Sequence, residues 1–193
     1  MKVRGIRWAA IVAVVWGLGA PATASAQVPV AYTLGAGAVI PIGGVVSERL
    51  TTGVHVDGGV YFKFLPMLSA GLHVGFDLPF GQQDPNNTFE HEARFTGISA
   101  RGMYTFDFVL GHFWTTLGAG LYFNKLTSCT REGLAGCGEE SVSQFGVNAD
   151  LGVNFKLWSD LSVGPAVGVV FPSVANFGDQ MLLTAAARFH WGF

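Results

Sequence analysis

The chain has 193 residues, of which 50% are hydrophobic, 12% are charged and 27 are glycine. This composition is too apolar for a disordered chain and too rich in glycine for a helical bundle. The formal net charge of −2 gives no indication of a nucleic-acid partner. No apolar run reaches the roughly 18 to 20 residues that a membrane-spanning helix needs.

The first 26 residues have the three parts of a secretory signal peptide. Three basic residues lie among the first seven, an apolar core spans Trp8–Ala20, and the segment ends in Ala24-Ser25-Ala26. A short membrane anchor is the alternative, but the core is too short to span comfortably and small residues at its end favour cleavage. We therefore expect one mature domain, residues 27–193, whose net charge falls from −2 to −5 because three positive charges are removed.

Eight segments of this domain alternate between apolar and polar or glycine residues with a period of two, which is the period of a β-strand. The predicted strands are Val30–Ile40, Val54–Phe64, Leu68–Leu78, Phe95–Phe108, His112–Asn124, Ser143–Leu157, Leu161–Phe171 and Met181–Phe193. The connections between them alternate between long and short. Two long polar connections, Gly81–Glu92 and Lys125–Ser141, are predicted to be loops.

This pattern predicts an all-β fold, an eight-stranded antiparallel up-and-down transmembrane β-barrel. The segments have about the nine to eleven residues of a tilted transmembrane strand, and alternating loop lengths are typical of outer-membrane barrels. No outward position of a predicted strand holds Asp, Glu, Lys or Arg. A soluble barrel or β-sandwich is the alternative, but it would place its apolar face inward and its charges outside.

The last predicted strand places Phe189, Trp191 and Phe193 on one apolar face, and other aromatic residues gather near both ends of the strands. This pattern resembles the small eight-stranded outer-membrane proteins of the OmpA/OmpX type. The resemblance implies a place in the bacterial outer membrane, in contact with its lipids and lipopolysaccharide. The three aromatic residues look like the C-terminal signal that such proteins offer to the outer-membrane assembly machinery. We expect a monomer.

Five ionisable residues are predicted to lie inside the barrel at similar heights, with carboxylates and guanidinium groups on alternate strands. They are Asp57, His73, Arg101, Asp150 and Arg188. Side chains fill the interior of an eight-stranded barrel, and buried charges need partners. We therefore expect a salt-bridge network that plugs the interior. The alternative is a narrow channel, a porin-like passage for small solutes, because many inward positions are glycine.

The inward histidines His55, His73, His112 and His190 lie on separate predicted strands without a compact spacing such as H-x-x-x-H. We therefore predict neither a metal site nor a cofactor. A barrel enzyme that processes lipopolysaccharide would need a nucleophile and its base on the lipid-facing surface. The outward positions of the predicted strands hold neither His nor carboxylate, so we predict no enzyme.

Two cysteines, Cys129 and Cys137, lie in one predicted external loop. In an exported protein such a pair is predicted to form a disulfide, with two free thiols or an incomplete metal pair as alternatives. The long loops are acidic on balance and are candidates for contact with a surface ligand. The sequence thus predicts a structural or surface-interaction role.

Overall fold

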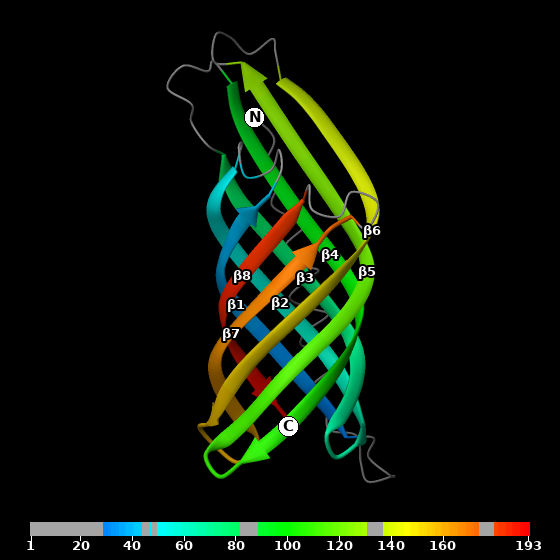
Figure 1. Ribbon diagram of the computed structural model, residues 1–193, viewed down its shortest axis with the longest axis vertical. Helices are drawn as coiled ribbons and strands as arrows, with labels where there is room; N and C mark the ends of the chain where they lie inside the picture. The colour runs from blue at the N-terminus through cyan, green and yellow to red at the C-terminus, as the bar shows by residue number, and fades with distance from the viewer. Residues whose placement is uncertain (1–28, 44–46, 48–49, 82–88, 131–136, 174–179) are drawn as a thin grey trace, which may run out of the picture.

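The computed structural model contains eight strands that close into a single barrel (Figure 1). It describes residues 29–43, 47, 50–81, 89–130, 137–173 and 180–193, so the predicted signal peptide, residues 1–26, lies outside the described part. The strands are β1 (Val30–Ile42), β2 (Leu50–Leu65), β3 (Leu68–Gly81), β4 (Phe89–Phe108), β5 (Gly111–Thr130), β6 (Cys137–Lys156), β7 (Leu161–Phe171) and β8 (Met181–Trp191). Among the described residues, no helix is long and apolar enough to cross a membrane.

Every strand pairs antiparallel with its neighbours in the sequence, and β8 returns to β1 to close the sheet. The closing ladder is continuous from Tyr32 opposite Trp191 to Ile42 opposite Met181. The predicted eight-stranded antiparallel barrel is therefore confirmed. Three short connections, β2–β3, β4–β5 and β6–β7, lie at the same end as the C-terminus, which we name the turn end (Figure 1). The opposite end is the loop end.

The two faces of the wall differ as the period-two pattern predicts. Large apolar residues on the outer face are exposed, such as Leu117 at 71% and Leu72 at 65%. Charged residues in the middle of the strands, such as Asp57 and Arg188, are buried in the interior. This arrangement is the reverse of that in a soluble barrel and is the arrangement found in membrane barrels.

Two predicted loops are wrong in their extent, because β4, β5 and β6 each continue to 20 residues. The β4–β5 ladder begins at Phe89 opposite Thr130, and the β5–β6 ladder begins at Cys129 opposite Cys137. Polar composition suggested loops here. In an antiparallel ladder, however, the backbone groups bond to each other, and both faces of such a strand can carry polar side chains in water.

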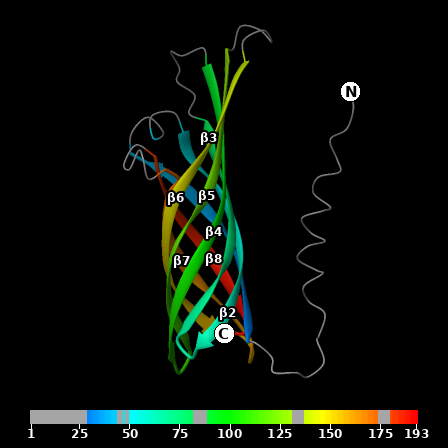
Figure 2. The same cartoon turned by 90° about the vertical axis from the view of Figure 1, so that its right-hand side faces the viewer.

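These longer strands rise beyond the barrel wall at the loop end (Figure 1 and Figure 2). Pairing between β3 and β4 ends at Asp77 opposite Phe95, and pairing between β6 and β7 starts at Val147 opposite Phe171. Beyond these points, within the described residues, β4, β5 and β6 pair only with one another. We name this three-stranded sheet the β4–β6 extension; it consists of residues 89–94, 124–130 and 137–146.

Candidate functional site

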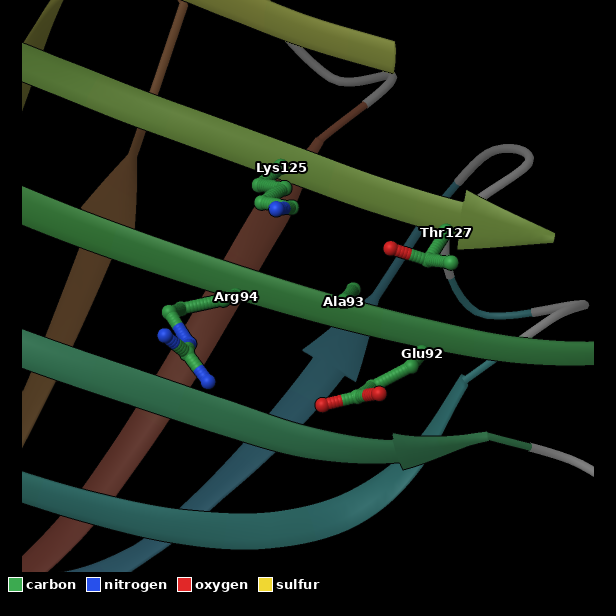
Figure 3. A pocket seen from close by; sticks show the side chains of 5 residues that line it. All are labelled: Glu92, Ala93, Arg94, Lys125 and Thr127. Atoms are coloured by element: carbon green, nitrogen blue, oxygen red, sulfur yellow. The ribbon is translucent and has the colours of Figure 1, made fainter. Parts of the chain in front are cut away.

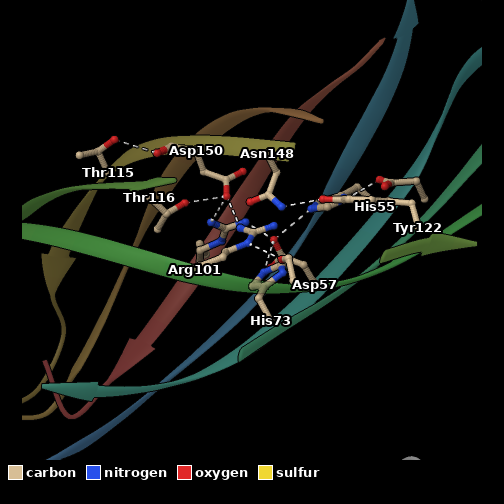
Figure 4. Close-up of polar contacts among 12 residues, drawn as sticks. His55, Asp57, His73, Arg101, Thr115, Thr116, Tyr122, Asn148 and Asp150 are labelled. Carbon is tan, nitrogen blue, oxygen red and sulfur yellow. Dashed lines mark hydrogen bonds and ion pairs between the residues drawn. The ribbon is translucent and has the colours of Figure 1, made fainter. Parts of the chain in front are cut away.

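The structure brings all five predicted interior residues together in one buried cluster. Figure 4 labels four of them, Asp57, His73, Arg101 and Asp150. Arg188 Nη2 donates to Asp57 Oδ2, and Arg101 Nη1 donates to Asp150 Oδ2. Arg188 Nη1 also lies 3.6 Å from Asp150 Oδ2, which links the two pairs. His73 Nε2 lies 3.3 Å from Asp57 Oδ2. The charges on β2, β4, β6 and β8 therefore form one connected network across the interior.

His55 on β2 and Asp77 on β3 extend this network, and sequence reasoning did not include them. His55 Nδ1 is 2.6 Å from Asp77 Oδ1, and His55 Nε2 is 3.1 Å from Asp57 Oδ2. Only an imidazolium carries N–H groups on both nitrogens, so a cationic His55 satisfies both contacts. In that form three carboxylates face three cations. Alternation places both residues inward, but only the β2–β3 register shows that they are opposite each other.

Neutral side chains complete the hydrogen bonding around the charges. Thr116 Oγ1 donates to Asp150 Oδ2 at 2.9 Å, and Arg101 Nε donates to Ser99 Oγ at 3.1 Å. On the loop-end side of this layer, the Asn148 amide donates to the Tyr122 hydroxyl oxygen at 2.6 Å. Hydrogen bonds to buried charges offset part of their desolvation cost.

The remaining inward histidines form a separate layer on the turn-end side. His112 Nε2 lies 3.0 Å from His190 Nδ1, and the two rings stack with centroids 5.2 Å apart. Beside them, Trp114 Nε1 donates to Asn154 Oδ1 at 2.9 Å. The Arg188 guanidinium carbon lies 4.9 Å from the centre of the Trp114 ring, so this layer contacts the charged network.

The inward glycines make room for side chains of neighbouring strands. Gly35 is opposite Asp57 on one side and opposite Arg188 on the other, and a Cβ at Gly35 would collide with Asp57. A Cβ at Gly152 would lie 2.6 Å from the Trp114 ring. The sequence left open whether the glycines line water or make space for large side chains. At these two positions the space is occupied by protein.

Apolar layers lie on the loop-end and turn-end sides of the polar ones, and neither layer was predicted from the sequence. At the loop end the buried cluster consists of Val39, Leu50, Ala93, Phe95, Tyr122, Val170 and Leu182. At the turn end it consists of Ala31, Tyr61 and Met103, with Phe193 packed against them. The period-two alternation predicts that most of these side chains face the interior. Their meeting across the interior depends on the closure of the barrel.

Phe193 corrects one part of the prediction for the last strand. Phe189 and Trp191 lie on the outer face as expected, and their rings stack with centroids 6.1 Å apart. Strand β8 ends at Trp191, and the next residue, Gly192, has a φ of 76°. The left-handed conformation of Gly192 turns Phe193 inward, where its ring centre lies 4.7 Å from that of His190. The final aromatic residue therefore covers the interior at the turn end.

The predicted disulfide concerns the tip of the β4–β6 extension. Cys129 on β5 and Cys137 on β6 are directly opposite each other in the register. Their side chains lie outside the part that the structure describes.

Comparisons with known proteins show the fold. No family model and no curated protein matches the chain. Among solved structures, Neisserial surface protein A superposes with a TM-score of 0.60 at 14% identity, covering 86% of this chain and 97% of its own. A major outer membrane protein of Thermus thermophilus gives 0.57 at 14% identity, covering 84% and 98%. Ail, the attachment invasion locus protein of Yersinia pestis, gives 0.51 at 12% identity, covering 84% and 96%. The chain has the fold of the small eight-stranded outer-membrane barrels.

Proposed function

We propose that the protein is a monomeric barrel of the bacterial outer membrane that is closed along its axis and acts through a surface interaction of the β4–β6 extension. The loop end then faces the outside of the cell and the turn end faces the periplasm. The observation that carries the proposal is the extension itself, a sheet that continues beyond the barrel wall with neither β3 nor β7 beside it. The barrel serves as its membrane anchor.

Three features of the interior support a closed axis. The charged network pairs its carboxylates with cations in the middle of the barrel. The layers at the loop end and the turn end present mainly apolar side chains to a hydrated ion passing along the axis, and the Tyr122 hydroxyl in the loop-end layer already accepts a hydrogen bond from Asn148. A narrow channel for small solutes, the alternative interpretation of the sequence, would require both layers and the network to open together.

The free edges of the extension support the surface role. Among the described residues, 89–94 of β4 and 137–146 of β6 pair on one side only, with β5. Unpaired strand edges are sites at which an extended polypeptide can add by backbone hydrogen bonding. Glu139 and Glu140 on the β6 edge are exposed, which favours a basic partner segment. The name of the structurally similar Ail protein refers to attachment.

Export and assembly follow the sequence signals. Residues 1–26 are proposed to be removed as a signal peptide, and Phe189, Trp191 and Phe193 to present the chain to the assembly machinery. Cys129 and Cys137 are proposed to form a disulfide that ties the β5 and β6 tips, because opposite residues in a ladder have Cβ atoms about 4.5–5.5 Å apart, near disulfide spacing. Unreduced protein should then gain no mass with N-ethylmaleimide, whereas two adducts on unreduced protein would refute the bond.

The closed axis is tested with the refolded chain of residues 27–193 in planar bilayers. We expect heat-modifiable mobility on gels, which shows a folded barrel, together with no conductance steps. Reproducible steps from heat-modifiable protein would overturn the closed axis in favour of the channel. Loss of heat-modifiable mobility would overturn the membrane barrel itself.

The surface role is tested by shortening the extension. Asn124 and Val142 are opposite each other, so residues 125–141 can be replaced by an Asn-Gly turn that joins β5 to β6. Cells that export the full chain should adhere to epithelial monolayers better than cells that export the shortened chain at equal heat-modifiable amounts. Equal adhesion would refute a role of the extension in attachment.

A further inference from the structure

Two basic side chains lie opposite each other on the outer surface at the base of the β4–β6 extension. Arg94 on β4 and Lys125 on β5 are register partners and are exposed (Figure 3). Among the described residues, they are the only lysine or arginine side chains at the loop end, because Arg101 and Arg188 are inside the barrel and Lys63 and Lys156 are at the turn end. Like charges directly opposite each other destabilise a ladder. An anion bound between Arg94 and Lys125 would reduce this repulsion.

The pair lies just above the apolar band of the outer wall. Phe123 on β5 is the last large apolar residue of its outward row, and Lys125 is the next residue on that face. Two residues along a strand span about 6 to 7 Å. Ile98 on β4 and Phe145 on β6 are exposed at the edge of the same band. In a membrane this position is the boundary between acyl chains and headgroups, where the phosphate groups of lipids lie.

The protein itself neutralises this pair only in part. Lys125 Nζ lies 2.7 Å from Glu139 Oε1, but both side chains are about half exposed, at 46% and 56%. Exposed ion pairs of this kind are weak. Arg94 forms no ion pair with any side chain that the structure describes. An anion can therefore bind to Arg94 and share Lys125 with Glu139.

The surface is hollowed between these residues. An open hollow of about 210 Å³ is lined by Glu92, Ala93, Arg94, Lys125 and Thr127 (Figure 3). A water molecule in the liquid occupies about 30 Å³, so the hollow has room for a phosphoryl group and part of the sugar that carries it.

We propose that this hollow binds a phosphorylated sugar of the outer-leaflet glycolipid, namely the phosphate-bearing glucosamine headgroup of lipid A. The proposal rests on the proposed outer-membrane orientation and names a lipid partner for it. The Arg94 guanidinium binds the phosphate in a bidentate manner, and the Lys125 ammonium supplies a second charge. Thr127 offers a hydroxyl donor beside them.

The Glu92 carboxylate favours a phosphorylated sugar over a free phosphate ion as the ligand of the hollow. Its carboxylate lines the same hollow and repels a free phosphate that approaches from its side. The same oxygens accept hydrogen bonds from hydroxyl or amide groups of a sugar next to the phosphate. The acyl chains of the glycolipid would lie below, against the exposed Phe123 and Ile98.

The test measures lipid retained by the refolded chain of residues 27–193 in detergent micelles, by native mass spectrometry. The probes are diphosphoryl lipid A, dephosphorylated lipid A and phosphatidylglycerol, with inorganic phosphate as a competitor. The variants are Arg94→Gln, Lys125→Gln and their combination. Lys156→Gln is the matched control, because it removes a lysine charge that is exposed on the other side of the proposed membrane.

We expect lipid A to bind in preference to both other lipids. Each single substitution removes one cationic group from the phosphate and should weaken lipid A binding by at least about tenfold, and the double substitution should abolish it. Lys156→Gln should bind as the unmodified chain does. Glu92→Gln should reduce the preference for lipid A over phosphatidylglycerol. Effective competition by millimolar inorganic phosphate would show a site for free phosphate and would overturn the assignment.

Equal retention of lipid A by the double variant, or equal binding of phosphatidylglycerol, would also overturn the site. Heat-modifiable mobility of every sample is recorded in parallel. A folded chain that shows no lipid A preference refutes this site while leaving the barrel intact. A chain without heat-modifiable mobility refutes the proposed function, on which the site depends.

Discussion

Arg188 on β8 donates a hydrogen bond to Asp57 on β2 across the intervening strand β1, although the two residues are 131 positions apart in the chain. Gly35 of β1 is opposite both of them in the register. Because Gly35 has no side chain, the guanidinium and the carboxylate can meet above its backbone. The ion pair between β8 and β2 therefore depends on the glycine of β1 that lies between them.

The Arg188–Asp57 pair should therefore contribute strongly to stability. Arg188→Met leaves the Asp57 carboxylate buried with fewer partners, and we expect the free energy of unfolding to fall by about 3–5 kcal/mol. Urea unfolding in lipid vesicles, followed by tryptophan fluorescence, measures this loss. The double variant Arg188→Met with Asp57→Asn should lose less than the sum of the two single variants. Additive losses would contradict a direct coupling.

His55 should be coupled to Asp77 in the same way. His55→Gln removes the cation between Asp77 and Asp57, and we expect a loss of about 1–3 kcal/mol from the unsatisfied carboxylates. Adding Asp77→Asn should restore part of this loss, because the second carboxylate charge is then removed. The urea midpoint of both variants provides the measurement. A double variant less stable than His55→Gln would disprove the coupling.

An added methyl group should lower stability at an inward glycine of the wall and should not lower it at an outward one. Gly152→Ala places its Cβ against the Trp114 ring and should cost about 1–3 kcal/mol through overpacking. Gly102→Ala is the matched control, because the outward Cβ there would have only the Leu117 carbonyl oxygen at 4.0 Å. It should leave stability unchanged or raise it by up to about 1 kcal/mol. Equal effects in urea unfolding would refute the filling of the interior by Trp114.

Disrupting the loop-end apolar layer alone should lower the stability of the barrel without opening it to ions. Leu182→Ala leaves a cavity in this fully buried layer and should cost about 2–5 kcal/mol. Leu183→Ala, on the outer face, should cost less because lipid can fill the space. The Leu182→Ala barrel should still be silent in planar bilayers, since Tyr61 and Met103 close the turn end. Conductance steps from this variant would show that the turn-end layer does not seal the barrel.

The sequence by itself determined the strand number, the antiparallel order and the face of the residues in the barrel wall, with Phe193 beyond the end of β8 as the exception. These properties depend on local alternation and on connection lengths, which are readable along the chain. It also placed Asp57, Arg101, Asp150 and Arg188 on the inner face, because charges on the apolar face would have met lipid.

Only the tertiary structure decided which of these residues meet. The pairing of His55 with Asp77, the passage of Arg188 over Gly35 and the apolar layers at both ends depend on register and on closure of the sheet, which join residues far apart in the chain. The inward turn of Phe193 depends on the backbone of Gly192, and the length of β4–β6 depends on mutual pairing in water. The polarity of side chains does not reveal which distant segments pair through their backbones. The polar composition of the β4–β6 extension therefore predicted loops where the structure has a sheet.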